Sequence, residues 1–199
     1  MRKLLLAAAL PLILAPAGPV GAAEKPRPAA IEGQWESACM PIGKNGRHGI
    51  VVRLTITRKT LTAVSQTYAH SNCDMPTVRI DYHADIVARA ATADAIDFDH
   101  VVKSVTMTAN HPEVVAIYNA DKAGVGCAFG GGWQLDVPRP VEGRTCPPQT
   151  LPTVGTRLYE RAWLVDGRLK IGSFPAAWNN TTPDKRPAMP GLLEFKPVK

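Results

Sequence analysis

Two groups of acidic residues and histidines have the residue types of a metal or acid–base site. The first group is Asp81, His83 and Asp85, which alternate with apolar residues along one predicted strand. Alternation places all three on the same face, with neighbours about 6.5 to 7 Å apart. Carboxylate and imidazole side chains on one face are candidate ligands for a divalent cation.

The second group is Asp97, Asp99 and His100. Residues on one face of a single strand seldom converge on an ion unless another strand adds ligands. We therefore predict that both groups lie on the solvent-exposed face of an antiparallel sheet. The sequence predicts neither a metal site nor a cofactor.

Motifs for nucleophilic catalysis are missing from the sequence. It contains neither a G-x-S-x-G elbow nor an H-E-x-x-H helix. The triple glycine at 130–132 is not followed by the Lys-Ser or Lys-Thr pair of a phosphate-binding loop. We therefore predict no catalytic residues and a protein that is not an enzyme.

Four cysteines, Cys39, Cys73, Cys127 and Cys146, are expected to form two disulfides in an exported protein. Three pairings are possible, and we favour Cys39 with Cys73 and Cys127 with Cys146, because each pair then encloses one structural unit. Loops of these lengths contribute about 4 and about 3 kcal/mol in the chain-entropy model. A four-thiolate metal site is disfavoured because the C-x2-C spacing is absent.

The first 23 residues have the pattern of a signal peptide. A basic start is followed by an apolar run at 4–14, which is too short to span a bilayer, and by the small residues of a cleavage site at 21–23. An uncleaved anchor is less favoured because Pro11 and Pro16 interrupt the apolar region. We expect a periplasmic or secreted protein that does not span the membrane, with residues 24–199 forming a single domain.

The net charge of +6 comes from residues scattered along the chain. Nucleic-acid binding would require a basic stripe with interleaved aromatic residues, and the sequence has none. The charge is typical of a soluble protein, and we predict no nucleic-acid partner.

Period-2 alternation is the strongest structural signal. It occurs at 50–57 and at 78–86, and Asp166-Gly167 between two apolar runs is typical of a two-residue type I′ hairpin. The period changes at Asn110, where a capping box predicts a helix over 110–122. Because the strands do not alternate with helices, the sequence predicts a mainly β fold, an antiparallel barrel of about eight strands with one short helix.

Four local predictions complete this interpretation. Residues 24–31 are expected to be extended, residues 133–137 are expected to form a short strand, and the apolar parity is expected to change near Asp99 and His100, where a bulge would lie. Residues 192–195 are expected to form a final edge strand.

Several features occur together in a known pattern: Gly33-x-Trp35, the spacing of Cys39 and Cys73 with Tyr68 between them, a helix leading into Gly126-Cys127 and Trp133, and Arg186-Pro187. This pattern resembles the extracellular domain of the adenomatosis-polyposis-coli-down-regulated Wnt inhibitors and their secreted bacterial relatives, which are lipocalin-like. The resemblance implies a lipocalin-like β-barrel with a hydrophobic pocket for a lipid or similar molecule, in a bacterial periplasm. It also implies that Arg157 or Arg161 packs on Trp35.

Two functions follow as hypotheses. The first is a binding protein that holds an apolar small molecule in the barrel, with Trp35 closing one end and the helix covering part of the sheet. Its ligand-contacting residues are not identified by the sequence. The second is a module that binds a protein partner through the Cys127 to Cys146 loop, which carries Phe129 and Trp133.

Overall fold

The computed structural model describes residues 27–120, 122–172, 174 and 178–198, so the predicted signal peptide at 1–23 lies outside the described residues. The strands are β1 (Gly33–Ser37), β2 (Met40–Ile42), β3 (His48–Ile56), β4 (Thr60–Tyr68), β5 (Pro76–Ala91), β6 (Ile96–Ala109), β7 (Arg139–Pro140), β8 (Thr145–Cys146), β9 (Gln149–Thr150), β10 (Arg157–Val165), β11 (Arg168–Ile171) and β12 (Glu194–Pro197). The helical elements are η1 (Pro28–Ile31), η2 (Lys44–Gly46), α1 (Pro112–Ala120), η3 (Lys122–Gly124) and η4 (Pro183–Lys185).

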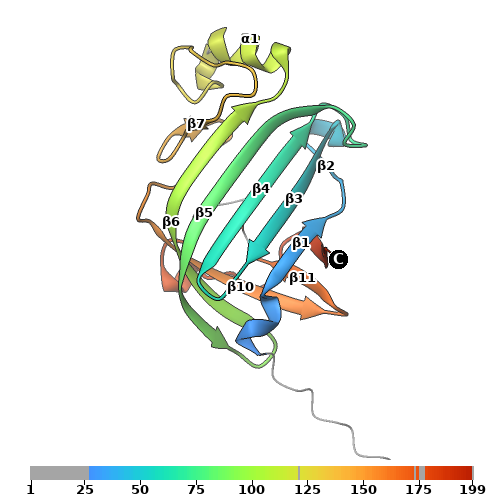
Figure 1. The fold of residues 1–199 in the computed structure, drawn as a ribbon, viewed down its shortest axis with the longest axis vertical. Helices are drawn as coiled ribbons and strands as arrows, with labels where there is room; N and C mark the ends of the chain where they lie inside the picture. Colours follow the sequence, from blue (N-terminus) through green and yellow to red (C-terminus); the bar gives the residue numbers. More distant parts are fainter. Residues whose placement is uncertain (1–26, 121, 173, 175–177, 199) are drawn as a thin grey trace, which may run out of the picture.

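Eight antiparallel strands close into a barrel. Strand β1 pairs with β3 on one side and with β12 on the other, which completes the ring β1-β3-β4-β5-β6-β10-β11-β12. The long strands β3 to β6 form a curved wall, and β10 and β11 cross its lower half (Figure 1). The predicted fold class is confirmed, although the last strand closes the barrel instead of forming an edge.

Side-chain alternation determines the inside of the barrel. In β3, Val52, Leu54 and Ile56 are buried while Arg53 is exposed. In β6 the buried side chains are those of even-numbered residues up to Val102 and of odd-numbered residues from Val105. The change occurs because a bulge opposite His83 and Ala84 adds one residue to the strand. The parity change therefore lies several residues after the predicted position. A second bulge does lie at the predicted position, where Val87 of β5 is the extra residue opposite Asp99 and His100.

One end of the barrel is closed by η1 and Trp35. The predicted extended conformation is wrong for residues 28–31, which form a 3-10 turn with Ile31 fully buried. The Trp35 indole Nε1 donates a hydrogen bond to the Ile31 carbonyl at 3.0 Å. Gly33 joins the turn to β1 with a φ of 138°, a backbone conformation that favours glycine. Trp35 itself is almost completely buried, as a residue closing this end must be.

Both predicted disulfides are confirmed, Cys39 with Cys73 and Cys127 with Cys146. The first links the β1–β2 connection to the β4–β5 turn. It packs directly on Gly49, where an added Cβ would lie 2.5 Å from the Cys73 Sγ atom. A glycine is therefore required on β3 at this point.

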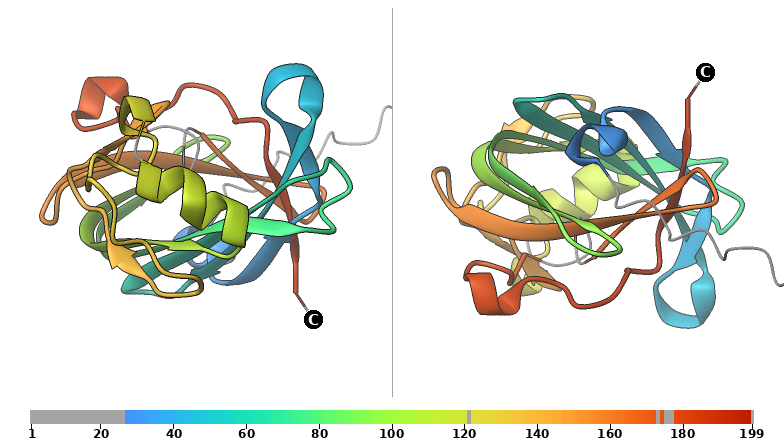
Figure 2. Two further views of the ribbon diagram at one scale, coloured as in Figure 1. Left: turned by 90° about the horizontal axis from the view of Figure 1, so that it is seen from above. Right: turned by 90° about the horizontal axis from the view of Figure 1, so that it is seen from below.

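The helix and the disulfide-bonded loop cover the opposite end of the barrel. Seen along the barrel, α1 lies across that end (Figure 2), with Val114, Val115 and Tyr118 packed on the core. The predicted strand at 133–137 is wrong, since this segment contributes only an isolated bridge between Ala109 and Leu135. The reason is local, because the backbone N–H of Trp133 donates instead to the Asn119 side chain at 2.7 Å.

The hairpin between β10 and β11 is formed as a two-residue turn, with φ of 50° at Asp166 and 71° at Gly167. A Cβ at Gly167 would contact no atom within 4 Å, so a substitution here changes only the backbone preference. We expect Gly167→Val to lower the free energy of unfolding by about 1 to 3 kcal/mol in chemical denaturation. Gly167→Asn, which tolerates positive φ, is the control and should cost less; equal stability of the valine variant and the wild type would contradict this account.

Candidate ligand-binding site

The lengths of the strands create a cavity in the upper half of the barrel. Strand β10 pairs with β6 only over Ile96 to Val101, at the lower end of β6. The upper parts of β3, β4 and β5 are therefore faced by irregular chain. A cavity of about 670 Å³ lies between this wall and the chain around Gln149, Gly172, Trp178 and Leu192.

The cavity is lined almost entirely by apolar side chains. The sheet contributes Met40, Ile42, Ile50, Ala63, Ser65, Thr67, Ile80 and Tyr82. The opposite wall consists of Pro148, Gln149, Ile171, Gly172, Phe174, Trp178, Gly191, Leu192 and Leu193. The deepest of these residues are buried, whereas Leu192 is 92% exposed and marks the entrance.

Three aromatic rings form a cluster on the cavity wall. The ring of Tyr82 lies 5.0 Å from that of Phe174 and 5.2 Å from that of Trp178, and Phe174 and Trp178 meet edge to face at 5.2 Å. The Trp178 indole N–H donates to the Gln149 side-chain oxygen at 3.0 Å. The cluster thus joins the sheet to the opposite wall.

A buried histidine lies behind this cluster. His100 is fully buried, contacts the rings of Phe98 and Phe174, and shares a 3.1 Å hydrogen bond between Nδ1 and the Tyr82 hydroxyl. Burial lowers the pKa of His100 to about 3, although the nearby Asp99 raises it, so the imidazole is neutral at physiological pH. Burial also raises the pKa of Tyr82, with a further contribution from Glu160. His100 Nε2 has no hydrogen-bond partner among the described residues.

The irregular wall is fixed to the barrel by polar side chains. Asn180 Nδ2 donates to the Glu160 carboxyl oxygen Oε1 at 2.5 Å and to the Tyr159 carbonyl at 2.9 Å, and both Glu160 and Asn180 are buried. Within this wall, Gly172 and Gly191 pack so closely that a Cβ on Gly191 would lie 2.1 Å from the Gly172 carbonyl oxygen. The position of this wall therefore depends on small residues and on buried hydrogen bonds.

The second acidic group is not on a solvated face, and this prediction is wrong. Besides the buried His100, Asp99 is almost completely buried, and its carboxylate contacts Arg157 and Arg186 at 2.5 and 2.6 Å. Asp97 contacts Arg161 at 2.5 Å and Arg186 at 3.3 Å. The cause is the late segment containing Arg186, which folds back over β6 and β10 and shields both carboxylates.

The first acidic group lies on the outer face of β5, where His83 is exposed and Asp81 and Asp85 are partly exposed. Asp81 pairs with Arg79 at 2.5 Å, and Asp85 pairs with Lys103 at 3.2 Å. Within the described residues, His, Cys, Asp and Glu side chains form no group of three that could hold a metal ion. The predicted solvent-exposed position is confirmed for these residues.

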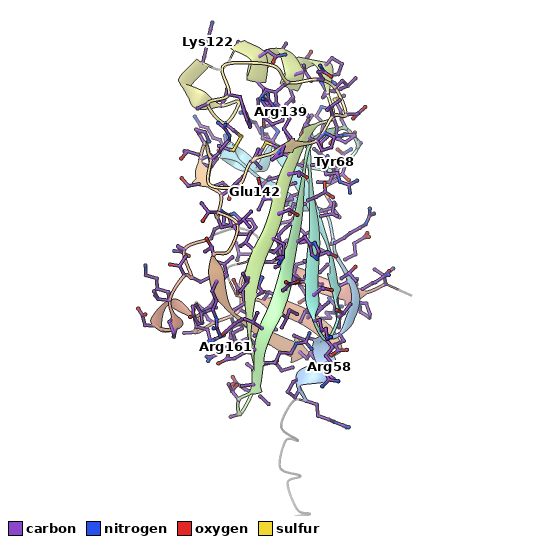
Figure 3. The ribbon with its side chains drawn as sticks, turned by 60° about the vertical axis from the view of Figure 1, so that its left-hand side comes forward. Arg58, Tyr68, Lys122, Arg139, Glu142 and Arg161 are labelled. Carbon is purple, nitrogen blue, oxygen red and sulfur yellow. A yellow bond between two sulfur atoms is a disulfide. The ribbon has the colours of Figure 1, made fainter. Side chains whose placement is uncertain are left out.

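The aromatic residues of the Cys127 to Cys146 loop pack inward. Trp133 is only 2% exposed and meets the rings of Tyr118 and Phe129 at 5.0 and 5.6 Å. The guanidinium carbons of Arg139 and Arg144 each lie 3.7 Å from the centre of the Phe129 ring, so the ring is held between two cations. Figure 3 shows Arg139 at this end of the molecule and Arg161 on the side of its lower half.

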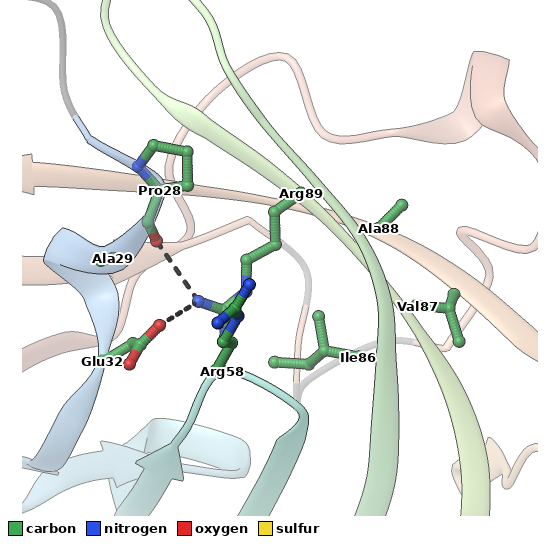
Figure 4. A pocket seen from close by; sticks show the side chains of 8 residues that line it. All are labelled: Pro28, Ala29, Glu32, Arg58, Ile86, Val87, Ala88 and Arg89. Atoms are coloured by element: carbon green, nitrogen blue, oxygen red, sulfur yellow. Dashed lines mark hydrogen bonds and ion pairs between the residues drawn. The ribbon is translucent and has the colours of Figure 1, made fainter.

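Arginine has a different role at the closed end from the one expected. The expected packing of Arg157 or Arg161 on Trp35 is wrong, since both pair with the β6 carboxylates. Arg89 of β5 instead reaches across this end and donates to Glu32 Oε1 at 2.8 Å and to the Pro28 carbonyl at 3.4 Å (Figure 4). It also donates to the Thr57 carbonyl. A shallow groove of about 570 Å³ with a mixed polar and apolar lining surrounds it.

The sequence comparisons identify no relative from which a function can be transferred. The sequence matches no protein-family model and no curated protein. Among the described residues, no helix is long and apolar enough to cross a membrane. The geometry of the cavity is therefore the basis for the functional conclusion.

Proposed function

We propose that this protein is an extracytoplasmic, non-enzymatic binding protein that holds a lipid or another apolar small molecule in its barrel. The observation that carries the proposal is the cavity of about 670 Å³ with its largely apolar lining. Ligand pockets commonly measure about 300 to 1,000 Å³ and combine an apolar lining with a few polar groups. The size and composition of the cavity both support binding of a small apolar molecule.

The polar groups near the cavity favour binding over catalysis. The imidazole of His100 lies behind Tyr82 and does not line the cavity. A general base requires direct reach to its substrate and a pKa near the working pH, and His100 meets neither condition.

The proposed location rests on the disulfides. Two disulfides and a basic, apolar leader are typical of exported proteins, because the cytosol keeps thiols reduced. The resemblance to the secreted Wnt-inhibitor relatives points to the same compartment and to the same class of ligand.

The alternative, a protein-binding module that uses the Cys127 to Cys146 loop, receives less support. Trp133 is buried and Phe129 lies between two arginines, so neither presents a free apolar contact surface. This loop does expose Leu135 and Val137, but its two aromatic residues, on which the alternative rests, pack inward.

The proposal is tested by blocking the cavity. Ala63 is a buried lining residue on β4, and Ala63→Phe would place a phenyl ring in the free volume. We expect the wild-type protein to bind the uncharged fluorescent probe N-phenylnaphthylamine saturably and the variant to bind it at least about tenfold more weakly, since a filled pocket excludes the probe. Fluorescence titration measures this difference.

Val64→Phe is the matched control, because the neighbouring residue on β4 points away from the cavity. Thermal unfolding of both variants checks that the barrel is retained. Native mass spectrometry of protein purified from its own host should also show a bound apolar molecule. Unsaturable probe binding by the wild type, or equal binding by Ala63→Phe, would overturn the proposal.

A further inference from the structure

The described residues of the cavity wall carry no charge. Every described residue that lines it, from the buried end to the entrance at Leu192, is uncharged at neutral pH. The cations of the neighbouring wall are engaged elsewhere, since Arg186 donates to the Asp99 carboxylate at 2.6 Å and to the Glu160 carbonyl at 2.6 Å. An ion inside this cavity would lose its hydration without gaining an opposite charge.

The buried carboxyl group of Glu160 lies close behind the same wall. Its Oε2 atom is 3.5 Å from the position that a Cβ on Gly172 would occupy, and Gly172 lines the cavity. Glu160 also interacts electrostatically with Tyr82 on the opposite side. This arrangement disfavours an anionic ligand in particular.

One hydroxyl group in the lining is free to bind a ligand. Thr67 donates to the Val78 carbonyl at 3.1 Å, and the Tyr82 hydroxyl bonds to His100. Ser65, which is 8% exposed, forms no hydrogen bond through its side chain to any other described residue. Its hydroxyl therefore provides one hydrogen bond within an apolar surface.

We propose that the cavity selects uncharged amphiphiles, namely molecules with an apolar body and one neutral oxygen group such as an alcohol or an ester, and that it discriminates against free carboxylates. The selection rests on the proposed function and adds the ligand's chemical class. Ser65 contacts the neutral oxygen, and the lack of a cation among the described lining residues excludes the carboxylate.

Three probes with matched chains test this selection in the mature, disulfide-bonded protein: dodecanol, methyl dodecanoate and dodecanoate at neutral pH. Each competes with N-phenylnaphthylamine in a displacement titration. We expect the alcohol and the ester to displace the probe at concentrations at least about tenfold lower than dodecanoate does, because the carboxylate is buried without a partner.

The outcomes separate the two proposals. Dodecanoate binding as tightly as the ester would overturn the charge selection and leave the proposed function in place. Failure of the fluorescent probe and of all three competitors to bind would overturn the proposed function itself.

Two substitutions localise the effect. Ser65→Ala should weaken dodecanol binding about threefold to tenfold, because one hydrogen bond is lost. The control is Thr62→Ala, whose side chain faces outward and whose removal should leave the binding unchanged.

Met40→Lys adds an ammonium group to the partly exposed part of the lining and should shift the preference toward dodecanoate. Unchanged dodecanol affinity in Ser65→Ala would remove Ser65 from the site, and an unchanged preference in Met40→Lys would contradict the role of charge.

Discussion

Replacing Arg186 with alanine should lower the free energy of unfolding by about 3 kcal/mol, because a largely buried carboxylate would lose one of its partners. The Arg186 and Asp99 side chains are only 16% and 8% exposed. Arg186 also donates to the Glu160 carbonyl, so one guanidinium group fixes the segment that forms the irregular cavity wall. Asp99 keeps Arg157 as a partner, which is why the expected loss lies at the lower end of the range for broken buried ion pairs.

Chemical denaturation measures this loss, and Arg168→Ala is its control. Arg168 pairs with Glu194, but both side chains are more exposed, so its removal should cost much less stability than the removal of Arg186. Probe binding should weaken in Arg186→Ala and stay unchanged in Arg168→Ala. Similar small losses in both variants would show that the Arg186 ion pairs do not hold the wall.

Lowering the pH should destabilise the protein through His100. Burial holds the pKa of His100 at about 3 in the folded state, against 6.5 for an ordinary histidine. The unfolded chain therefore binds a proton that the folded protein does not accept, and stability is lost as the pH falls from 6.5 toward 3. Between about pH 8 and about pH 5 this group alone should lower the free energy of unfolding by about 2 kcal/mol.

The matched variant is His100→Asn, whose side-chain oxygen can still accept a hydrogen bond from Tyr82. Its stability at neutral pH is expected to be lower because of the lost volume, so the comparison concerns only the dependence on pH. Urea denaturation across the pH range should show a shallower acid slope for the variant than for the wild type. Parallel slopes would assign the acid sensitivity to carboxylates that both proteins share.

Local signals in the sequence were sufficient for most of the barrel. Alternation at 50–57 identifies the buried face of β3, and Asp166-Gly167 identifies a hairpin because both residues tolerate positive φ. The disulfide pairing was predicted correctly because each pair of cysteines encloses one structural unit. Each of these inferences depends on residues close together in the chain or on a short repeated pattern.

The site depends instead on contacts between distant residues. The sequence predicted that His100 and Asp99 lie on the surface. The local pattern shows neither the bulge in β6 nor the ion pair that Arg186 forms with Asp99. The Trp133 segment has the composition of a strand, yet Asn119 binds its backbone N–H. The position of Ser65 inside the barrel does follow from the alternation of β4. The cavity beside it, however, exists only because β10 pairs with the lower end of β6 and because β11 and β12 are short.

The pairing of β1 with β12, which closes the barrel, affects how the chain folds. Trp35 of β1 pairs with Pro197 of β12, so strands from opposite ends of the described chain must meet before the ring closes. Such a topology has a high contact order, and domains of this kind fold on timescales of about milliseconds to seconds. Until β12 docks, β1 and β11 expose unpaired edges that can add to another chain. A protein truncated before Glu194 is therefore expected to aggregate. Strand β12 thus protects the protein from self-association in addition to closing the barrel.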